Sequence, residues 1–238
     1  MPVYVYSITA DDHPLKLDDL TGVGDPPGPL RIVSAAGLSA VVSDAAEELR
    51  PKRRDLTAHQ GVQDRLMRDG TVLPFRFGLT APDDEAVRAA LTDNAETYRE
   101  RLETLAGCAE YHMKVSQDED ALLRSILADS EPARQMTSAI REGSASPDTP
   151  LNLGQLVSQE VEARQKALAA GVMEALRPYA RAEVSYSSGS DSFLGTSFLV
   201  GEEEEEEQFL TAQQSLAHQF GDEITFRLRG PLPPYSFV

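Results

Sequence analysis

The chain has 238 residues, 41% of them apolar, which is enough for one large domain or two small ones with buried cores. Its 39 acidic and 22 basic residues give a formal net charge of −17, which disfavours nucleic acid and anionic lipid as partners. The single cysteine, Cys108, excludes an intrachain disulfide. The start resembles no leader, and no window approaches the roughly 20 apolar residues of a membrane helix. We therefore expect a soluble cytoplasmic protein with no membrane contact.

The first elements in chain order are β-strands. Residues 3–8, "VYVYSI", are apolar on both sides, which predicts a central, buried strand. Residues 30–35 and 38–44 are apolar runs separated by Ala36-Gly37, and this spacing predicts a short hairpin.

Two helical segments follow, with a short strand between them. A helix is expected to begin with Asp55 as its N-cap and to end at Gly70, with His59 on or near its apolar stripe. Residues 71–79, "TVLPFRFGL", read as a strand interrupted by Pro74, because proline cannot donate to a ladder. Residues 80–107 then predict one long helix, or two broken near Asn94.

The second half of the chain alternates strands and helices. Strands are expected at 108–115, 181–187, 193–200 and 223–229, with long helices at about 153–176 and 203–220. A capping box at 116–119 opens an additional helix, the signal for regular structure drops over about 128–150, and "REGSASPDTP", residues 141–150, reads as a flexible loop or insertion by composition. This order matches the ferredoxin-like βαββαβ plan, with the additional helix and loop inserted in the first crossover.

No sequence motif indicates catalysis. The chain lacks a GxGxxG opening a helix, a Walker-type loop, a CxxC pair and an HExxH pair. The four histidines, at 13, 59, 112 and 218, have no partner at metal-ligand spacing. We therefore expect no catalytic residue, no metal and no cofactor, and we read His59 as a hydrogen-bonded histidine rather than a general base.

Two stretches leave alternatives open. In "PFRFG", residues 74–78, Phe75 and Phe77 share one side of an extended strand with Arg76 opposite, so the stretch either packs a sheet edge or forms a contact site. The run Glu202–Glu207 is favourable at a helix N-terminus, and we read it as a solvated face rather than a cation site.

The C-terminal stretch "GPLPPYSFV", residues 230–238, is apolar and rich in proline. Gly230 is expected to turn the chain away from the last strand, and the prolines to hold the tail extended. We favour a tail that packs against the protein itself through Tyr235, Phe237 and Val238, with a free partner-binding peptide as the alternative.

Several of these stretches together resemble the gas vesicle protein F and L family, accessory proteins of gas vesicle formation. They are "VYVYSI", "GLSAVVSD", His59 followed by "VQDRLMRDGTVLPFRFG", "LETLAGCAEYHMKV" and the terminal "GPLPPYSFV". The sequence departs from the family at Ser7, Leu79 and Leu232, where Gly, Thr and Trp are common. The assignment as F-like or L-like stays open.

The resemblance implies a non-enzymatic α+β protein of two domains, at 1–107 and 108–238. The second domain is expected to be ferredoxin-like, with a variable region at about 130–150 and the apolar tail 230–238. The implied partners are the small hydrophobic gas vesicle shell protein A and other gas vesicle accessory proteins, at the gas vesicle or in the cytoplasm. The implied role is in nucleation, as a chaperone or as a minor structural component. The expected partner-binding residues are Phe75, Arg76, Phe77, His59, Tyr235 and Phe237.

Three alternatives to an assembly factor remain at this point. One is a ferredoxin-like ligand-binding or regulatory protein, since this fold hosts many functions. Another is an enzyme with acid/base chemistry at His59 or His112. The third is a structural component of the vesicle wall.

Overall fold

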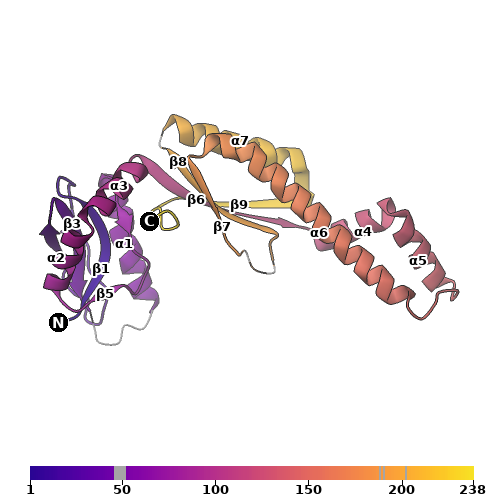
Figure 1. Ribbon diagram of the computed structural model, residues 1–238, viewed down its shortest axis with the longest axis horizontal. Coiled ribbons are helices and arrows are strands. Elements are labelled where there is room, and N and C mark those ends of the chain that lie inside the picture. Colours follow the sequence, from indigo (N-terminus) through magenta and orange to yellow (C-terminus); the bar gives the residue numbers. More distant parts are fainter. Residues whose placement is uncertain (46–51, 188, 190, 202) are drawn as a thin grey trace. The chain divides into compact units, whose positions relative to one another are not determined.

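A computed structural model describes residues 1–45, 52–187, 189, 191–201 and 203–238. The described chain is a mixed helix-and-sheet protein with two sheets (Figure 1), and the α+β class is confirmed. It divides into two compact units. The first contains residues 1–111, 199–202 and 230–238, and the second contains residues 112–198 and 203–229. The C-terminal tail therefore groups with the first unit.

The sheet of the first unit is built around β1, Val3–Ala10, whose first seven residues are all buried. The strand order is β2-β3-β1-β4, with β5 also paired to β1. The other strands are β2 (Arg31–Ala35), β3 (Leu38–Asp44), β4 (Leu73–Pro74) and β5 (Thr80–Ala81). The predicted central, buried strand is confirmed.

The predicted hairpin is also confirmed. Strands β2 and β3 are antiparallel with Ala35 opposite Leu38, and the two turn residues Ala36 and Gly37 have φ angles of 53° and 72°. These left-handed angles match the right-handed twist of the paired strands, and glycine adopts them without steric cost.

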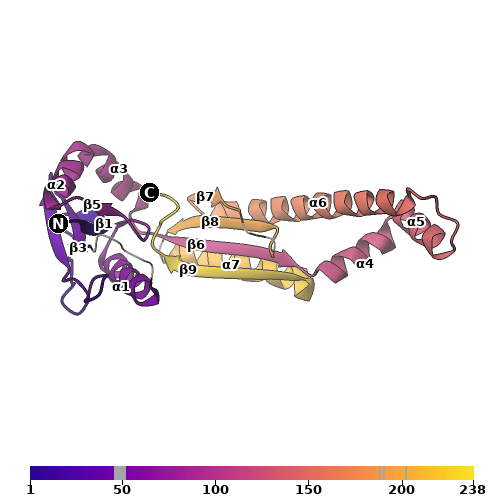
Figure 2. The same cartoon turned by 90° about the horizontal axis from the view of Figure 1, so that it is seen from below.

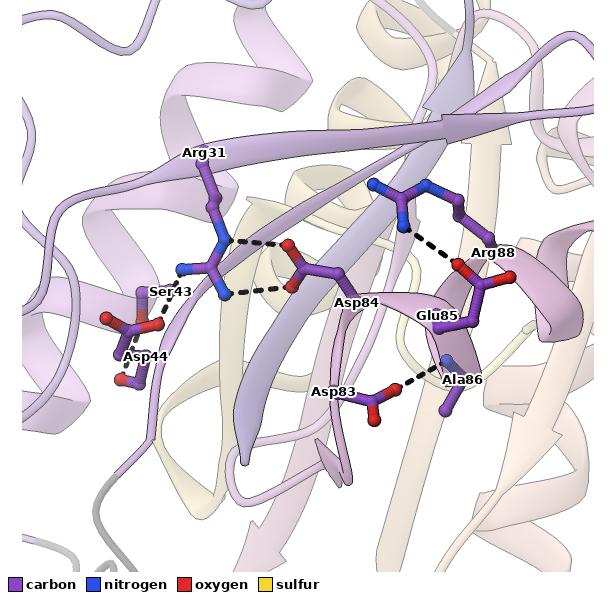
Figure 3. Close-up of polar contacts among 8 residues, drawn as sticks. All are labelled: Arg31, Ser43, Asp44, Asp83, Asp84, Glu85, Ala86 and Arg88. Carbon is purple, nitrogen blue, oxygen red and sulfur yellow. Dashed lines mark hydrogen bonds and ion pairs between the residues drawn. The ribbon is translucent and has the colours of Figure 1, made fainter. Parts of the chain in front are cut away.

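Arg31 fixes this hairpin to the helix beside it (Figure 3). Its guanidinium donates to both carboxylate oxygens of Asp84, at 3.2 and 2.8 Å, and to Oδ1 of Asp44 at 2.8 Å. The hydrogen bond from Arg31 holds the pKa of Asp84 below its usual range. Asp84 is the first residue of α2, so a bidentate pair joins the edge strand to a helix N-terminus, where a carboxylate is also favoured by the helix dipole.

Helices α2 (Asp84–Asp93) and α3 (Ala95–Leu105) replace the single long helix that was one of two alternatives. The break falls at Asn94. Asp83 caps α2, because its side chain accepts a hydrogen bond from the Ala86 backbone at 2.8 Å (Figure 3). Val87 and Leu91 of α2, with Leu102 and Leu105 of α3, are buried against one face of the sheet.

Helix α1, Arg53–Asp69, covers the opposite face and buries Val62 and Leu66 against Tyr4 and Tyr6. The prediction that Asp55 is its N-cap is wrong, because the helix begins two residues earlier. Asp55 lies in the first turn, is 3% exposed, and accepts a hydrogen bond from the Gly24 backbone. A buried carboxylate there ties a preceding loop to the helix instead of capping it.

The second sheet has the strand order β7-β8-β6-β9. Its strands are β6 (Cys108–Gln117), β7 (Ala182–Ser185), β8 (Leu194–Gly201) and β9 (Ile224–Leu232). Two long helices, α6 (Thr149–Leu176) and α7 (Glu204–Phe220), lie on one side of it (Figure 1). Phe198 of β8 packs on Phe209 of α7, with ring centroids 5.2 Å apart, and both side chains are fully buried.

The low signal over about 128–150 conceals a helix, and the loop expected at 141–150 is present only as the connection 142–148. Helix α4, Glu119–Asp129, is followed directly by α5, Glu131–Arg141, and α6 begins at Thr149. Ser130 caps α5, and a proline follows at the first turn, a strong start signal that composition alone obscured. The predicted capping box also fails, since Asp118 rather than Ser116 caps α4.

Candidate partner-binding site around His59

His59 lies on α1 at the centre of an aromatic cluster and is 5% exposed. Its Nδ1 atom is 2.9 Å from the hydroxyl of Tyr4, and that hydroxyl accepts a hydrogen bond from the Gly78 backbone at 3.1 Å. The ring of Tyr6 stacks on the imidazole and the ring of Phe77 meets it edge-on, each with centroids 5.7 Å apart. The cluster thus joins β1, α1 and the loop after β4.

The protonation of the imidazole depends on its contacts and on its burial. The Tyr4 hydroxyl accepts from Gly78 and can donate its own proton to Nδ1 of His59, an arrangement in which Nε2 is the protonated nitrogen. Burial lowers the pKa of His59 to about 4, against a smaller opposing effect of a hydrogen bond to the Phe75 backbone. Burial also raises the pKa of Tyr4 well above its ordinary value. His59 is therefore neutral at physiological pH.

The loop from 75 to 79 differs from the extended strand that we expected. Strand β4 ends at Pro74, and Phe75 and Phe77 pack on opposite faces of the sheet: Phe75 against the cluster that contains Leu73 and Leu105, Phe77 against the one that contains Tyr4. The prediction that they share one side is wrong because the chain leaves the ladder after Pro74. Both phenylalanines are half-buried, and Arg76 between them is exposed.

The C-terminal tail closes the site. The hydroxyl of Tyr235 lies 3.4 Å from Nε2 of His59, with the two rings stacked, and Phe237 packs against the core cluster of the first unit. The Ser236 backbone N–H and hydroxyl donate to the two carboxylate oxygens of Glu110, at 2.8 and 2.6 Å. The favoured reading, in which the tail packs against the protein itself, is confirmed for Tyr235 and Phe237, whereas Val238 is exposed.

The path of the tail was predicted incorrectly in two respects. The chain does not leave the sheet at Gly230, since β9 continues to Leu232. It is not extended afterwards either, because Phe237 donates a backbone hydrogen bond to the Pro234 carbonyl, which forms a turn. Gly230 is required for another reason: a Cβ at this position would lie 2.4 Å from the ring of Tyr111.

Sequence reasoning missed Glu110 and Tyr4, the two residues that connect to the tail and to His59. Glu110 is fully buried within β6. The only signal available in the sequence was an acidic residue between Ala109 and Tyr111 inside a predicted strand. Its partner Ser236 is 126 residues away, and no local pattern encodes that distance.

Among the residues that the structure describes, the polar contacts of His59 are two tyrosine hydroxyls and a backbone group. His13 is similar, with Nε2 at 3.0 Å from the Leu66 carbonyl. Within the described residues, no group of three or more His, Cys, Asp or Glu side chains is placed to hold a metal ion. In the same part of the chain, no helix is long and apolar enough to cross a bilayer.

The fold and the site define an α+β protein of two compact units whose C-terminus seals a buried histidine–aromatic cluster. The model of a family described as "Gas vesicle synthesis protein GvpL/GvpF" matches residues 2–238, and the chain belongs to this family. It is 42% identical over 240 residues to Gas vesicle protein F of Streptomyces sp. (strain CB03234), with both sequences covered completely. It is 26% identical to Gas vesicle protein F of Dolichospermum flosaquae, covering 100% of this chain and 98% of that protein.

The solved structures agree with the fold. The crystal structure of the gas vesicle protein GvpF from Anabaena sp. PCC7120 superposes with a TM-score of 0.85 at 24% identity, covering 99% of this chain and 97% of that one. The structure of GvpF from Microcystis aeruginosa superposes with a TM-score of 0.80 at 25% identity, covering 99% and 98%. The resemblance stated from the sequence is confirmed.

Proposed function

We propose that this protein is a non-enzymatic accessory factor of gas vesicle formation that binds the small hydrophobic shell protein, other accessory proteins, or both. The observation that carries this proposal is the family match over residues 2–238, joined by 42% identity to a gas vesicle protein F. The buried, neutral imidazole of His59, whose polar contacts are two tyrosine hydroxyls and a backbone group, supports a role without acid/base chemistry.

A physical reason for such a factor lies in the wall that it helps to build. A protein that lines a gas-filled wall exposes apolar surface before it is assembled, and exposed apolar surface aggregates unless it is covered. A partner with a net charge of −17 keeps the covered complex soluble.

The contact surface that we propose is the 75–79 loop with the tail beside it. Arg76 is exposed, and so is Leu79, at 42%. The backbone of the loop is held at both ends, since Phe75 N–H donates to the Tyr6 carbonyl at 2.9 Å and the Leu79 carbonyl accepts from Val5 at 3.0 Å. A contact loop that is already ordered loses little entropy on binding. His59 contacts Phe77 of the loop, and Tyr235 stacks on His59. Phe237 packs against the same core cluster as Phe75.

Co-purification with the shell protein tests the surface. Because Phe75 and Phe77 pack into the core, alanine at both would confuse lost binding with lost folding. Arg76→Glu with Leu79→Ser changes only exposed side chains, and we expect it to reduce capture at least tenfold. Arg141→Glu with Leu151→Ser makes the same chemical changes on exposed residues of α5 and α6 and serves as the control. Equal capture by the two double variants removes the loop from consideration.

We further infer that the second unit is ferredoxin-like. The strand order β7-β8-β6-β9 and the sequence βαββαβ support this inference, with α4 and α5 inserted before α6. A stringent wash of purified vesicles distinguishes an assembly factor from a wall component. Recovery in the wash supports the assembly factor that we propose, and retention on the vesicles supports the wall component.

A further inference from the structure

The sheet face of the second unit that lies opposite α7 carries a strip of basic side chains. We define the basic strip as Lys114, Arg227 and Arg229. Their neighbours along β6 and β9, Met113 and Phe226, face the helices: Met113 is fully buried, and the Phe226 ring lies 6.0 Å from the Phe220 ring at the end of α7. Because side chains alternate along a strand, the strip lies on the other face. Figure 2 shows the strands of this sheet in front of α7.

Two contacts set the register that brings the strip together. The Asp118 backbone N–H donates to the Glu223 carbonyl at 3.0 Å, and Gly230 lies directly against the Tyr111 ring. An antiparallel register that satisfies both contacts places Lys114 opposite Arg227. Arg229 is on the same face, two residues further along β9. The pairing therefore places two positive charges side by side on one face of the sheet.

The acidic counterpart lies on the helix side of the same unit. The first turn of α7 contains Glu204, Glu205, Glu206 and Glu207. Glu205 pairs with Arg181 at 2.9 Å, while Glu204 and Glu207 are exposed. Residue 202, the first of the glutamate run, lies outside the described residues. The helix dipole favours carboxylates here, but that effect acts within one turn and does not require four of them.

We propose that the basic strip of one molecule binds the acidic first turn of α7 of a second copy. The two surfaces lie on opposite sides of one sheet, so they cannot meet within a molecule. A contact between different patches of identical chains is heterologous, and it extends head to tail unless the rotation closes a ring. Arginine is suited to the contact because its planar guanidinium binds a carboxylate through two parallel hydrogen bonds.

Charges elsewhere in the chain do not prevent this association. Arg227 reaches Asp191 of its own molecule only at 3.9 Å, with both side chains exposed, and such a pair contributes little. At physiological ionic strength the Debye length is about 8 Å, so the repulsion between two chains of net charge −17 is largely screened beyond that distance. Local complementarity then decides the contact. The inference is independent of the proposed role in gas vesicle formation, because it concerns the purified chain alone.

A charge-swap experiment by sedimentation velocity tests the contact in the full chain. We expect the unmodified protein to form concentration-dependent assemblies larger than dimers at about 0.15 M salt. Arg227→Glu with Arg229→Glu, and separately Glu204→Arg with Glu207→Arg, should each weaken self-association at least tenfold. Each variant alone presents two surfaces of the same sign, whereas an equimolar mixture of the two pairs opposite charges at both contacts. The mixture should therefore recover assemblies larger than dimers.

Controls separate the loss of this contact from a change in net charge or in folding. Arg134→Glu with Arg141→Glu reverses two exposed charges of α5 and should leave self-association unchanged. Circular dichroism confirms that each variant folds. A monomer at all concentrations overturns the proposal, and so does a mixture that fails to associate. Binding of a polyglutamate peptide or of single-stranded DNA to the strip, without self-association, would also overturn it, by assigning the strip to a different anionic partner.

Discussion

The two units of the chain use their helices in opposite ways. Helix α1 of the first unit has 17 residues and buries five of them, including His59 and Gln63. Helix α6 of the second unit has 28 residues and buries only Val172 and Leu176, both near its end. The first unit places hydrogen-bonded polar groups inside a dense core, whereas the second leaves apolar side chains such as Leu151 exposed, at 64%. Stability should therefore respond strongly to changes in the first unit and weakly to changes along α6.

Among the changes that test this contrast, removal of the tail should cause the largest loss of stability. Truncation after Gly230 deletes Phe237 from the core and leaves the buried carboxylate of Glu110 without the two hydrogen bonds from Ser236. We expect a loss of roughly 4 kcal/mol or more in the free energy of unfolding, measured by urea titration. Deletion of Val238 alone, which is 45% exposed, is the control and should change the free energy by less than about 0.5 kcal/mol. Normal stability of the truncated chain would contradict the packing of the tail.

A pair of glycine substitutions compares the two units directly. Gly230→Ala places a methyl group 2.4 Å from the Tyr111 ring, and we expect a loss of about 2 to 3 kcal/mol from overpacking. Gly171→Ala, in α6, places its methyl group where no atom lies within 4 Å apart from the adjacent residues and the backbone of the same helix. It should stabilise the protein by up to about 1 kcal/mol through helix propensity. Similar effects of the two changes on the midpoint of thermal unfolding would refute the contrast.

Acid should weaken the first unit through His59. Its pKa is about 4 in the folded protein and about 6.5 when unfolded. Between these pH values the unfolded chain binds more protons than the folded protein. The contribution of the neutral His59 to the free energy of unfolding is therefore fully present above pH 6.5 and falls as the pH drops toward 4. We expect this contribution to reach about 2 to 3 kcal/mol.

His59→Gln isolates the contribution from the carboxylates that titrate in the same range. The difference in unfolding free energy between the unmodified protein and this variant should shrink as the pH falls from about 7 to about 4. A difference that does not vary with pH would show that the histidine is accessible to protons in the folded state.

The sequence predicted those parts of the fold that depend on local pattern. Alternation along β1 and the Ala36-Gly37 turn identified the central strand and the hairpin, because both signals lie within a few residues. The residues 128–150 were misread because small and polar side chains obscured α5, which buries only Ala133. The contacts of Tyr235 and Ser236 could not be predicted, since their partners lie 176 and 126 residues away.

The smallest expected effect lies at the exposed start of α6. Leu151→Ser removes an apolar side chain that is 64% exposed, so little buried area is lost, and we expect a change of less than about 0.5 kcal/mol. Leu66→Ser makes the same substitution at a fully buried position of α1, and should cost at least about 3 kcal/mol because it leaves a cavity and a buried hydroxyl. Urea titration of both variants measures the two losses of unfolding free energy, which can then be compared. A cost at Leu151 close to that at Leu66 would mean that the start of α6 is covered in solution, and its dependence on protein concentration would then show whether a second copy covers it.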